Sequence, residues 1–109
     1  MNVIVLAKGA GMGAWVDQDF AHARQIVYVK ESGGFDSEEN PFITKSDRSL
    51  ELSQFILKAF PDTHAIVAGA FDDESRQFFQ EHGIALYIAT QGSVMELAEK
   101  AGQGALSRV

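Results

Sequence analysis

Glycines that follow an apolar strand are the first residues in this chain whose spacing could do chemistry. The strand is expected over residues 3–7, and Gly9 and Gly11 follow it directly. An acidic residue, Glu31, lies about 20 residues further on, which is the spacing of a dinucleotide-binding fingerprint. In that fingerprint the glycines let the backbone approach a pyrophosphate at the N-terminus of the next helix. The interpretation therefore requires a helix over residues 14–25.

The same segment has a second interpretation, in which a loop leads directly into the next strand. Asp19 and His22 are weak helix formers, and both lie inside the helix that a dinucleotide site requires. After the strand expected over residues 26–29, a Gly-Gly pair and Asn40-Pro41 stand where a dinucleotide fold would continue with a crossover helix. These residues favour the loop, but they leave both interpretations open.

Composition limits the ligands and partners that this chain can have. Its 109 residues are enough for a single domain, and 46% of them are hydrophobic and 22% charged. Without cysteine, thiolate ligands and disulfides are excluded, so a metal needs His, carboxylate, Met or backbone ligands. The net charge of -6 disfavours binding to nucleic acid, although Lys8 or Arg24 could contact a smaller anion. No apolar run approaches the roughly 18 residues that span a membrane, so we expect a cytoplasmic protein without a membrane partner.

The middle of the chain predicts an edge strand, a helix and a buried strand. Residues 35–43 are extended or turn-like, as is typical of a sheet edge. A helix with Ser46 or Asp47 as its N-cap is expected to end before Pro61. Residues 65–68 are apolar throughout, which favours a strand buried on both faces.

Two further helices separated by a strand complete the pattern. The first begins at Asp72 or Asp73 and ends at a glycine, and one stripe of it contains Phe71, Ser75, Phe78 and His82. A strand over residues 84–89 leads to a helix whose Ser93 and Glu96 predict a capping box. The core face of that last helix is expected to consist of Val94, Leu97, Ala98 and Ala101. The order of elements therefore predicts an α/β domain with three layers, and its first two strands are expected to be antiparallel.

Several short motifs share the spacing of one known family. The segment from Val16 to Arg24 resembles its V-x-x-H-F-G-R-A element, and Asn40-Pro41 stands where it often has Asn-Pro. The most specific similarity lies near the C-terminus, in Gly83-Ile84 with Tyr87, Gly92-Ser93-Val94 with Glu96-Leu97-Ala98, and Gly104-Ala105-Leu106. This pattern resembles the dinitrogenase iron–molybdenum cofactor biosynthesis family, also called nitrogenase accessory factors. Because the resemblance spans nearly the whole chain, residues 1–109 are interpreted as one domain of this type.

The resemblance implies both a fold and a function. It implies a ribonuclease H-like α/β/α fold whose five-stranded mixed sheet has one antiparallel strand. It also implies a small non-catalytic protein that binds or carries a metal–sulfur cluster, such as the iron–molybdenum cofactor or its precursor. The partners would be cluster-assembly proteins or target metalloproteins. Two alternatives remain open: a diverged member that serves as a protein-interaction module without cofactor, and a dinucleotide-binding domain.

The candidate cofactor site lies at the ends of the first and fourth strands. Its residues are Gly9, Gly11, Gly13, Asp19, His22, Arg24, Gly69 and Gly92, with His22 as the candidate metal ligand. Glycines at these positions would bring backbone N–H groups close to an anionic cluster. The chain departs from the family pattern at Asp19, where the family has His, and at Phe71, which interrupts a glycine-rich turn.

Overall fold

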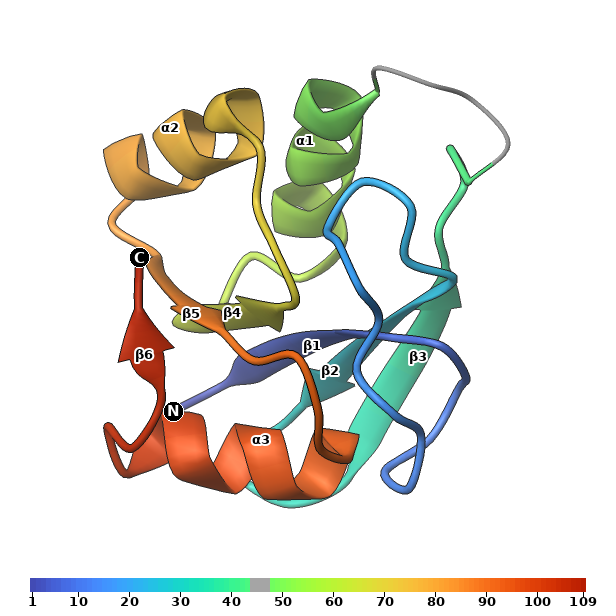
Figure 1. Ribbon diagram of the computed structural model, residues 1–109, viewed down its shortest axis with the longest axis vertical. Helices are drawn as coiled ribbons and strands as arrows, with labels where there is room; N and C mark the ends of the chain where they lie inside the picture. The colour runs from blue at the N-terminus through green and yellow to red at the C-terminus, as the bar shows by residue number, and fades with distance from the viewer. Residues whose placement is uncertain (44–47) are drawn as a thin grey trace.

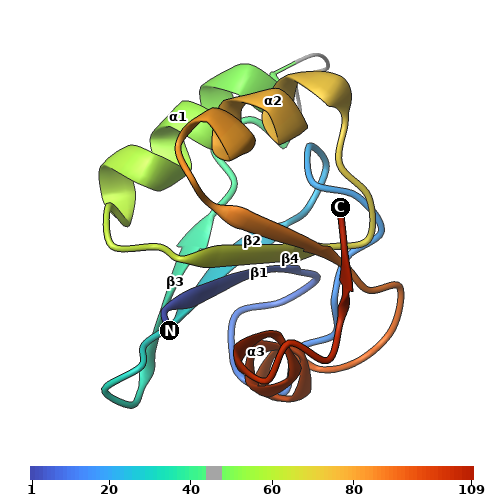
Figure 2. The ribbon, with the colours of Figure 1, turned by 90° about the vertical axis from the view of Figure 1, so that its left-hand side faces the viewer.

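The computed structural model describes residues 1–43 and 48–109, which form one mixed sheet between two layers of helices (Figure 1). Helices α1 and α2 cover one face of the sheet and α3 covers the other (Figure 2). The order of layers expected from the sequence is therefore confirmed. In chain order the elements are β1 Val3–Ala7, β2 Gln25–Val29, β3 Phe35–Glu39, α1 Ser49–Ala59, β4 Ala65–Ala68, α2 Asp73–Glu81, β5 Ala85–Ile88, α3 Val94–Gly102 and β6 Ser107–Arg108.

The sheet has six strands in the order β3-β2-β1-β4-β5-β6. Strand β1 is parallel to β4 and antiparallel to β2, and β4 is parallel to β5. Strand β6 pairs antiparallel to β5, with Ile88 opposite Ser107. The expected five strands with one antiparallel member were therefore wrong, because β6 is a sixth strand and a second one of opposite direction. Its two exposed polar residues carry no strand pattern, so only the pairing with β5 reveals it.

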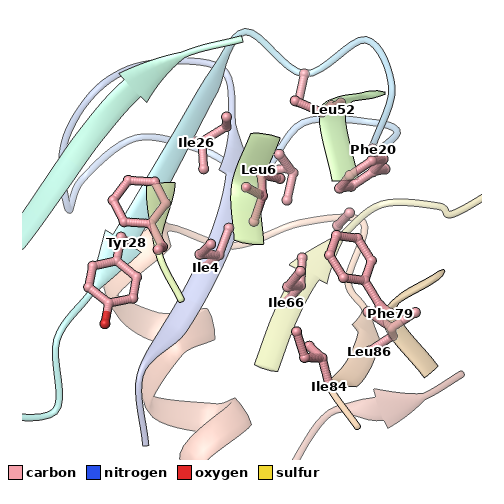
Figure 3. Packing of buried hydrophobic residues seen from close by; sticks show 14 residues of the cluster. Ile4, Leu6, Phe20, Ile26, Tyr28, Leu52, Ile66, Phe79, Ile84 and Leu86 are labelled. Carbon is pink, nitrogen blue, oxygen red and sulfur yellow. The ribbon is translucent and has the colours of Figure 1, made fainter. Parts of the chain in front are cut away.

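Strand β1 lies at the centre of the core and is buried along its whole length, as the sequence predicts. Because side chains alternate along a strand, Ile4 and Leu6 face the layer of α1 and α2, and Val5 faces α3. Figure 3 shows Ile4 and Leu6 among the aromatic and aliphatic side chains of the first cluster, which include Phe20 and Phe79. The central strand therefore separates two apolar cores.

Local capping signals account for the start of α3. The Ser93 hydroxyl accepts a hydrogen bond from the Glu96 N–H, and the Glu96 carboxylate accepts one from the Ser93 N–H, so the predicted capping box is confirmed. The expected core face of α3 is also confirmed, because Val94, Leu97, Ala98 and Ala101 are all buried. In the part of the chain that the structure describes, no helix combines the length and the apolar character needed to cross a membrane.

The other two helices differ from expectation in detail. Asp72 caps α2 as predicted, by accepting a hydrogen bond from the Ser75 N–H. The stripe of α2 that faces the core contains Ser75 and Phe79, so the expected placement of Phe78 was one residue off and its side chain is only half-buried. Helix α1 begins at Ser49, and the caps proposed for it at positions 46 and 47 lie outside the described residues.

Candidate functional site

The glycine-rich segment between β1 and β2, residues 8–24, forms no helix. We call it the hairpin, because its first half turns back on the end of β1. Ala7 and Val16 form an antiparallel bridge, and the Lys8 N–H donates to the Trp15 carbonyl at 2.9 Å. Residues 14–25 contain no helix. A dinucleotide fingerprint needs a helix N-terminus directly after its glycines, so the dinucleotide interpretation was wrong and the loop interpretation is confirmed.

The hairpin crosses the carboxyl ends of the parallel strands, where an α/β sheet usually binds its ligands. The Asp17 N–H donates to the Leu6 carbonyl at the end of β1, and the Phe20 N–H donates to the Ala70 carbonyl after β4. The Phe20 side chain is fully buried there, and its ring lies 5.7 Å from the ring of Phe71. Phe71, which departs from the family pattern, therefore helps to hold the hairpin against the sheet.

Gly69 and Gly92 contact this hairpin and leave little room beside it. A Cβ atom on Gly69 would lie 2.7 Å from the Asp17 carbonyl oxygen and closer still to that of Gln18. Gly92 has a φ of +125°, and its carbonyl accepts a hydrogen bond from the Val16 N–H at 3.0 Å. Gly69 is therefore explained by close packing of the loop backbone, and Gly92 by its positive φ and by the Leu97 side chain, 3.0 Å from where a Cβ atom would lie.

The N-terminus of α3 is also closed by the hairpin. The Val94 N–H donates to the Ala14 carbonyl at 2.9 Å, and the Met95 N–H donates to the Met12 carbonyl at 3.0 Å. A helix N-terminus binds anions through N–H groups that lack an intrahelical partner. Because the loop carbonyls and the capping box already use these groups, the start of α3 cannot serve as an anion cradle in this conformation.

Asp19 and His22 form an exposed pair on the same loop. The His22 Nδ1 atom lies 3.0 Å from the Asp19 carboxylate, which also accepts a hydrogen bond from the His22 N–H at 2.8 Å. Among residues 1–43 and 48–109, no group of three or more His, Cys, Asp or Glu side chains is arranged to hold a metal ion. The pair therefore offers at most two protein donors to a metal that brings its remaining ligands with it.

A cleft of about 490 Å³ opens beside the hairpin, where β1 ends, β2 begins and β3 ends. Its lining residues are Lys8, Arg24, Gln25, Glu39, Asn40 and Ile43. Lys8 and Arg24 are exposed, and neither forms an ion pair with a described residue. These two cations outnumber the one carboxylate of the lining, Glu39, although the chain as a whole has a net charge of -6. The cleft can therefore attract an anion by both charge and hydrogen bonding.

Asn40 holds the wall of this cleft in place. Its side chain is 3% exposed, and its amide donates to the carbonyls of Ala21 at 3.1 Å and Ala23 at 2.9 Å. Its side-chain oxygen accepts a hydrogen bond from the Phe42 N–H at 2.9 Å. These bonds join the end of β3 to the chain directly before Arg24, so they set the position of that cation.

Of the site residues predicted from the sequence, only Arg24 lines the cleft. Gly9, Gly11 and Gly13 follow Lys8 in the hairpin, Gly69 lies against the backbone of Gln18, and the Gly92 carbonyl is bound by the Val16 N–H. Sequence reasoning did not group Gln25, Glu39, Asn40 and Ile43 with a site, because their proximity depends on the pairing of β2 with β3. The Asn40-Pro41 pair was the one local signal that pointed to this region.

The sequence matches the family described as dinitrogenase iron-molybdenum cofactor over residues 1–104. The chain belongs to this family. The dinitrogenase iron–molybdenum cofactor family is thus established over nearly all of the chain, as its motifs predicted. No curated protein matches the sequence.

Solved structures support the same fold for this family member. The apo form of the orange protein from Desulfovibrio gigas superposes with a TM-score of 0.88 at 20% identity, covering 99% of this chain and 92% of that one. A candidate NifB protein from Thermotoga superposes with a TM-score of 0.81 at 18% identity, covering 98% and 91%. A candidate dinitrogenase from Methanocaldococcus jannaschii gives 0.67 at 15% identity, covering 100% and 94%. At these identities the likeness concerns the fold alone.

Proposed function

We propose that this protein binds an anionic metal–sulfur cluster of the iron–molybdenum cofactor type and carries it between proteins, without catalysing a reaction. The observation that carries the proposal is the cleft between β1, β2 and β3, which two cations, Lys8 and Arg24, line together with a single carboxylate, Glu39. Membership of the dinitrogenase iron–molybdenum cofactor family supports this class of ligand. A cleft of about 490 Å³ is large enough for a compact polynuclear anion.

The donor set fits a cluster that arrives complete. The chain has no cysteine, so it supplies no thiolate to build or anchor an iron–sulfur core. Lys8 and Arg24 would instead donate hydrogen bonds to sulfide or oxygen atoms at the surface of the cluster. Binding that rests mainly on charge and hydrogen bonds, without a thiolate bond, is readily reversible, which is what a carrier requires.

The loop residues predicted from the sequence extend this proposal. Asp19 and His22 are exposed on the segment that leads to Arg24, so His22 is proposed as a nitrogen ligand to one metal of the cluster. The hairpin containing Gly9, Gly11 and Gly13 would flank the cluster, and Gly69 and Gly92 would support that hairpin from below. We further propose a ribonuclease H-like classification of the fold and a cytoplasmic location, with cluster-assembly or target metalloproteins as partners.

Gel filtration of the protein with isolated iron–molybdenum cofactor under anaerobic conditions tests the proposal. We expect the visible absorbance of the cluster to elute with the protein. Replacing His22 by Ala should weaken the association, whereas His82→Ala, at the exposed end of α2, serves as the matched control and should not. Absorbance that elutes apart from the wild-type protein would refute the carrier function and favour a protein-interaction module without cofactor.

A further inference from the structure

Helices α1 and α2 run side by side on the same face of the sheet (Figures 1 and 2). A second hollow lies between them. It has a volume of about 200 Å³, and its lining residues are Leu50, Glu74, Gln77, Phe78 and Glu81. None of these residues lines the cleft of Lys8 and Arg24. The groove between α1 and α2 is therefore a separate surface, which stays available when the cleft is filled.

Four of the groove residues form one stripe along α2. Glu74, Gln77, Phe78 and Glu81 follow the spacing i, i+3, i+4 and i+7, which places them on one face of the helix. This face is distinct from the core-facing one, which contains Phe79. Phe78 is half-buried, and its ring lies 5.5 Å from that of Phe79 in an edge-to-face contact. The stripe thus presents a fixed aromatic surface between two carboxylates.

The carboxylate of Glu81 is poorly placed for the stability of α2 itself. It lies in the last position of the helix, where the helix dipole disfavours a negative charge, and the last turn has no basic residue. The Gln77 amide donates to it at 3.2 Å, and neither Glu74 nor Glu81 forms an ion pair with a described residue. A cation supplied from outside the chain would compensate both carboxylates.

We propose that the groove between α1 and α2 binds a basic amphipathic helix of a partner protein. An apolar side chain of that helix would lie against Leu50 and Phe78. Glu74 and Glu81 are separated by seven residues of helix, about 10 Å along the axis. Lysine or arginine side chains two turns apart on the partner would therefore meet both carboxylates. This proposal does not depend on the cofactor proposed for the cleft.

Fluorescence anisotropy with a synthetic labelled peptide tests this proposal on the intact protein. The probe is a helical peptide of alanine, leucine and lysine, with a leucine pair between two lysines two turns apart. We expect saturable binding that weakens with added salt. The Glu74→Gln/Glu81→Gln variant should bind about tenfold more weakly or worse. The matched control, Glu38→Gln/Glu99→Gln, removes two exposed carboxylates from β3 and α3 and should bind like the wild type.

Charge reversal separates specific docking from general attraction to an acidic protein. The Glu74→Lys/Glu81→Lys variant should prefer a peptide in which both lysines are replaced by glutamate. The single variant Glu81→Lys should also unfold at a higher temperature than the wild type, because a cation at position 81 suits the end of the helix while Glu74 stays in its first turn. The proposal is overturned if the wild type fails to bind the basic peptide, or if the Gln variant and its control weaken binding equally.

Discussion

The Cα atom of Gly69, directly after β4, faces the carbonyl group of Gln18 in the hairpin that follows β1. A side chain at position 69 has no space, because its Cβ would lie 2.6 Å from the Gln18 carbonyl carbon. The obstacle is backbone and not a flexible side chain, so it cannot turn away. This contact fixes the hairpin over the carboxyl ends of the parallel strands and leaves the cleft beside Lys8 as the accessible space.

Replacing Gly69 by Ala should destabilise the protein, because the hairpin must move to admit the added methyl group. We expect the free energy of unfolding to fall by about 1–3 kcal/mol, as for other overpacked sites. Urea denaturation followed by circular dichroism measures the loss. Gly13→Ala is the matched control, because a Cβ there meets no atom within 4 Å. Equal stability of the two variants would contradict the close contact.

Replacing Asn40 by Ala should destabilise the protein. The change removes three hydrogen bonds of the buried Asn40 side chain, to the carbonyls of Ala21 and Ala23 and from the Phe42 N–H. We expect a loss of about 2–3 kcal/mol in the free energy of unfolding. Gln54→Ala, an exposed change on α1, should cost little by comparison. A loss no larger than that of the control would mean that the Asn40 bonds are unimportant.

The charge of the Met1 amino group should control the pKa of the Glu31 carboxyl group. The two groups are 2.8 Å apart, and hydrogen bonding to the amino group, together with its positive charge, lowers the pKa of Glu31. Because this pKa is lower in the folded state, the pair stabilises the fold above the unfolded pKa and loses its effect as pH falls through the folded value.

Titration of the Glu31 carboxyl by NMR checks this relationship directly. In the wild type the pKa should lie below the usual value for glutamate. Acetylation of the amino group removes its charge, so the pKa should rise towards that usual value. Asn2 provides a further contact, because its side chain accepts a hydrogen bond from the Glu31 N–H at 2.8 Å. A pKa that acetylation leaves unchanged would assign the shift to another cause.

Much of the fold could be predicted because its signals are local. A continuous apolar run identified β1, and the pairing of Ser93 with Glu96 located the start of α3 within one turn. The two-residue strand β6 could not be predicted, because it is defined only by its partner β5. In α2 the position of Phe79 was missed because adjacent phenylalanines fit neighbouring stripes of the helix equally well.

The candidate site was harder to predict because tertiary contacts determine which groups remain exposed. Glycines at positions 69 and 92 have the composition of a ligand cradle, but the backbone of Asp17 and Gln18 fills the space beside Gly69, and the Leu97 side chain fills that beside Gly92. The two cations of the cleft come from opposite ends of one loop, Lys8 at its beginning and Arg24 at its end. Only the bridge between Ala7 and Val16, together with the pairing of β1 and β2, brings those ends together.

The affinity of the Lys8→Ala/Arg24→Ala variant for isolated iron–molybdenum cofactor tests the central proposal most directly. Each cation should contribute about 1 kcal/mol in a solvated cleft, so the double variant should bind about thirtyfold more weakly in anaerobic equilibrium dialysis. The control Lys58→Ala/Arg108→Ala removes the same charges from exposed positions outside the cleft and should bind like the wild type. If the cleft variant binds as tightly as this control, the cofactor is not held by Lys8 and Arg24.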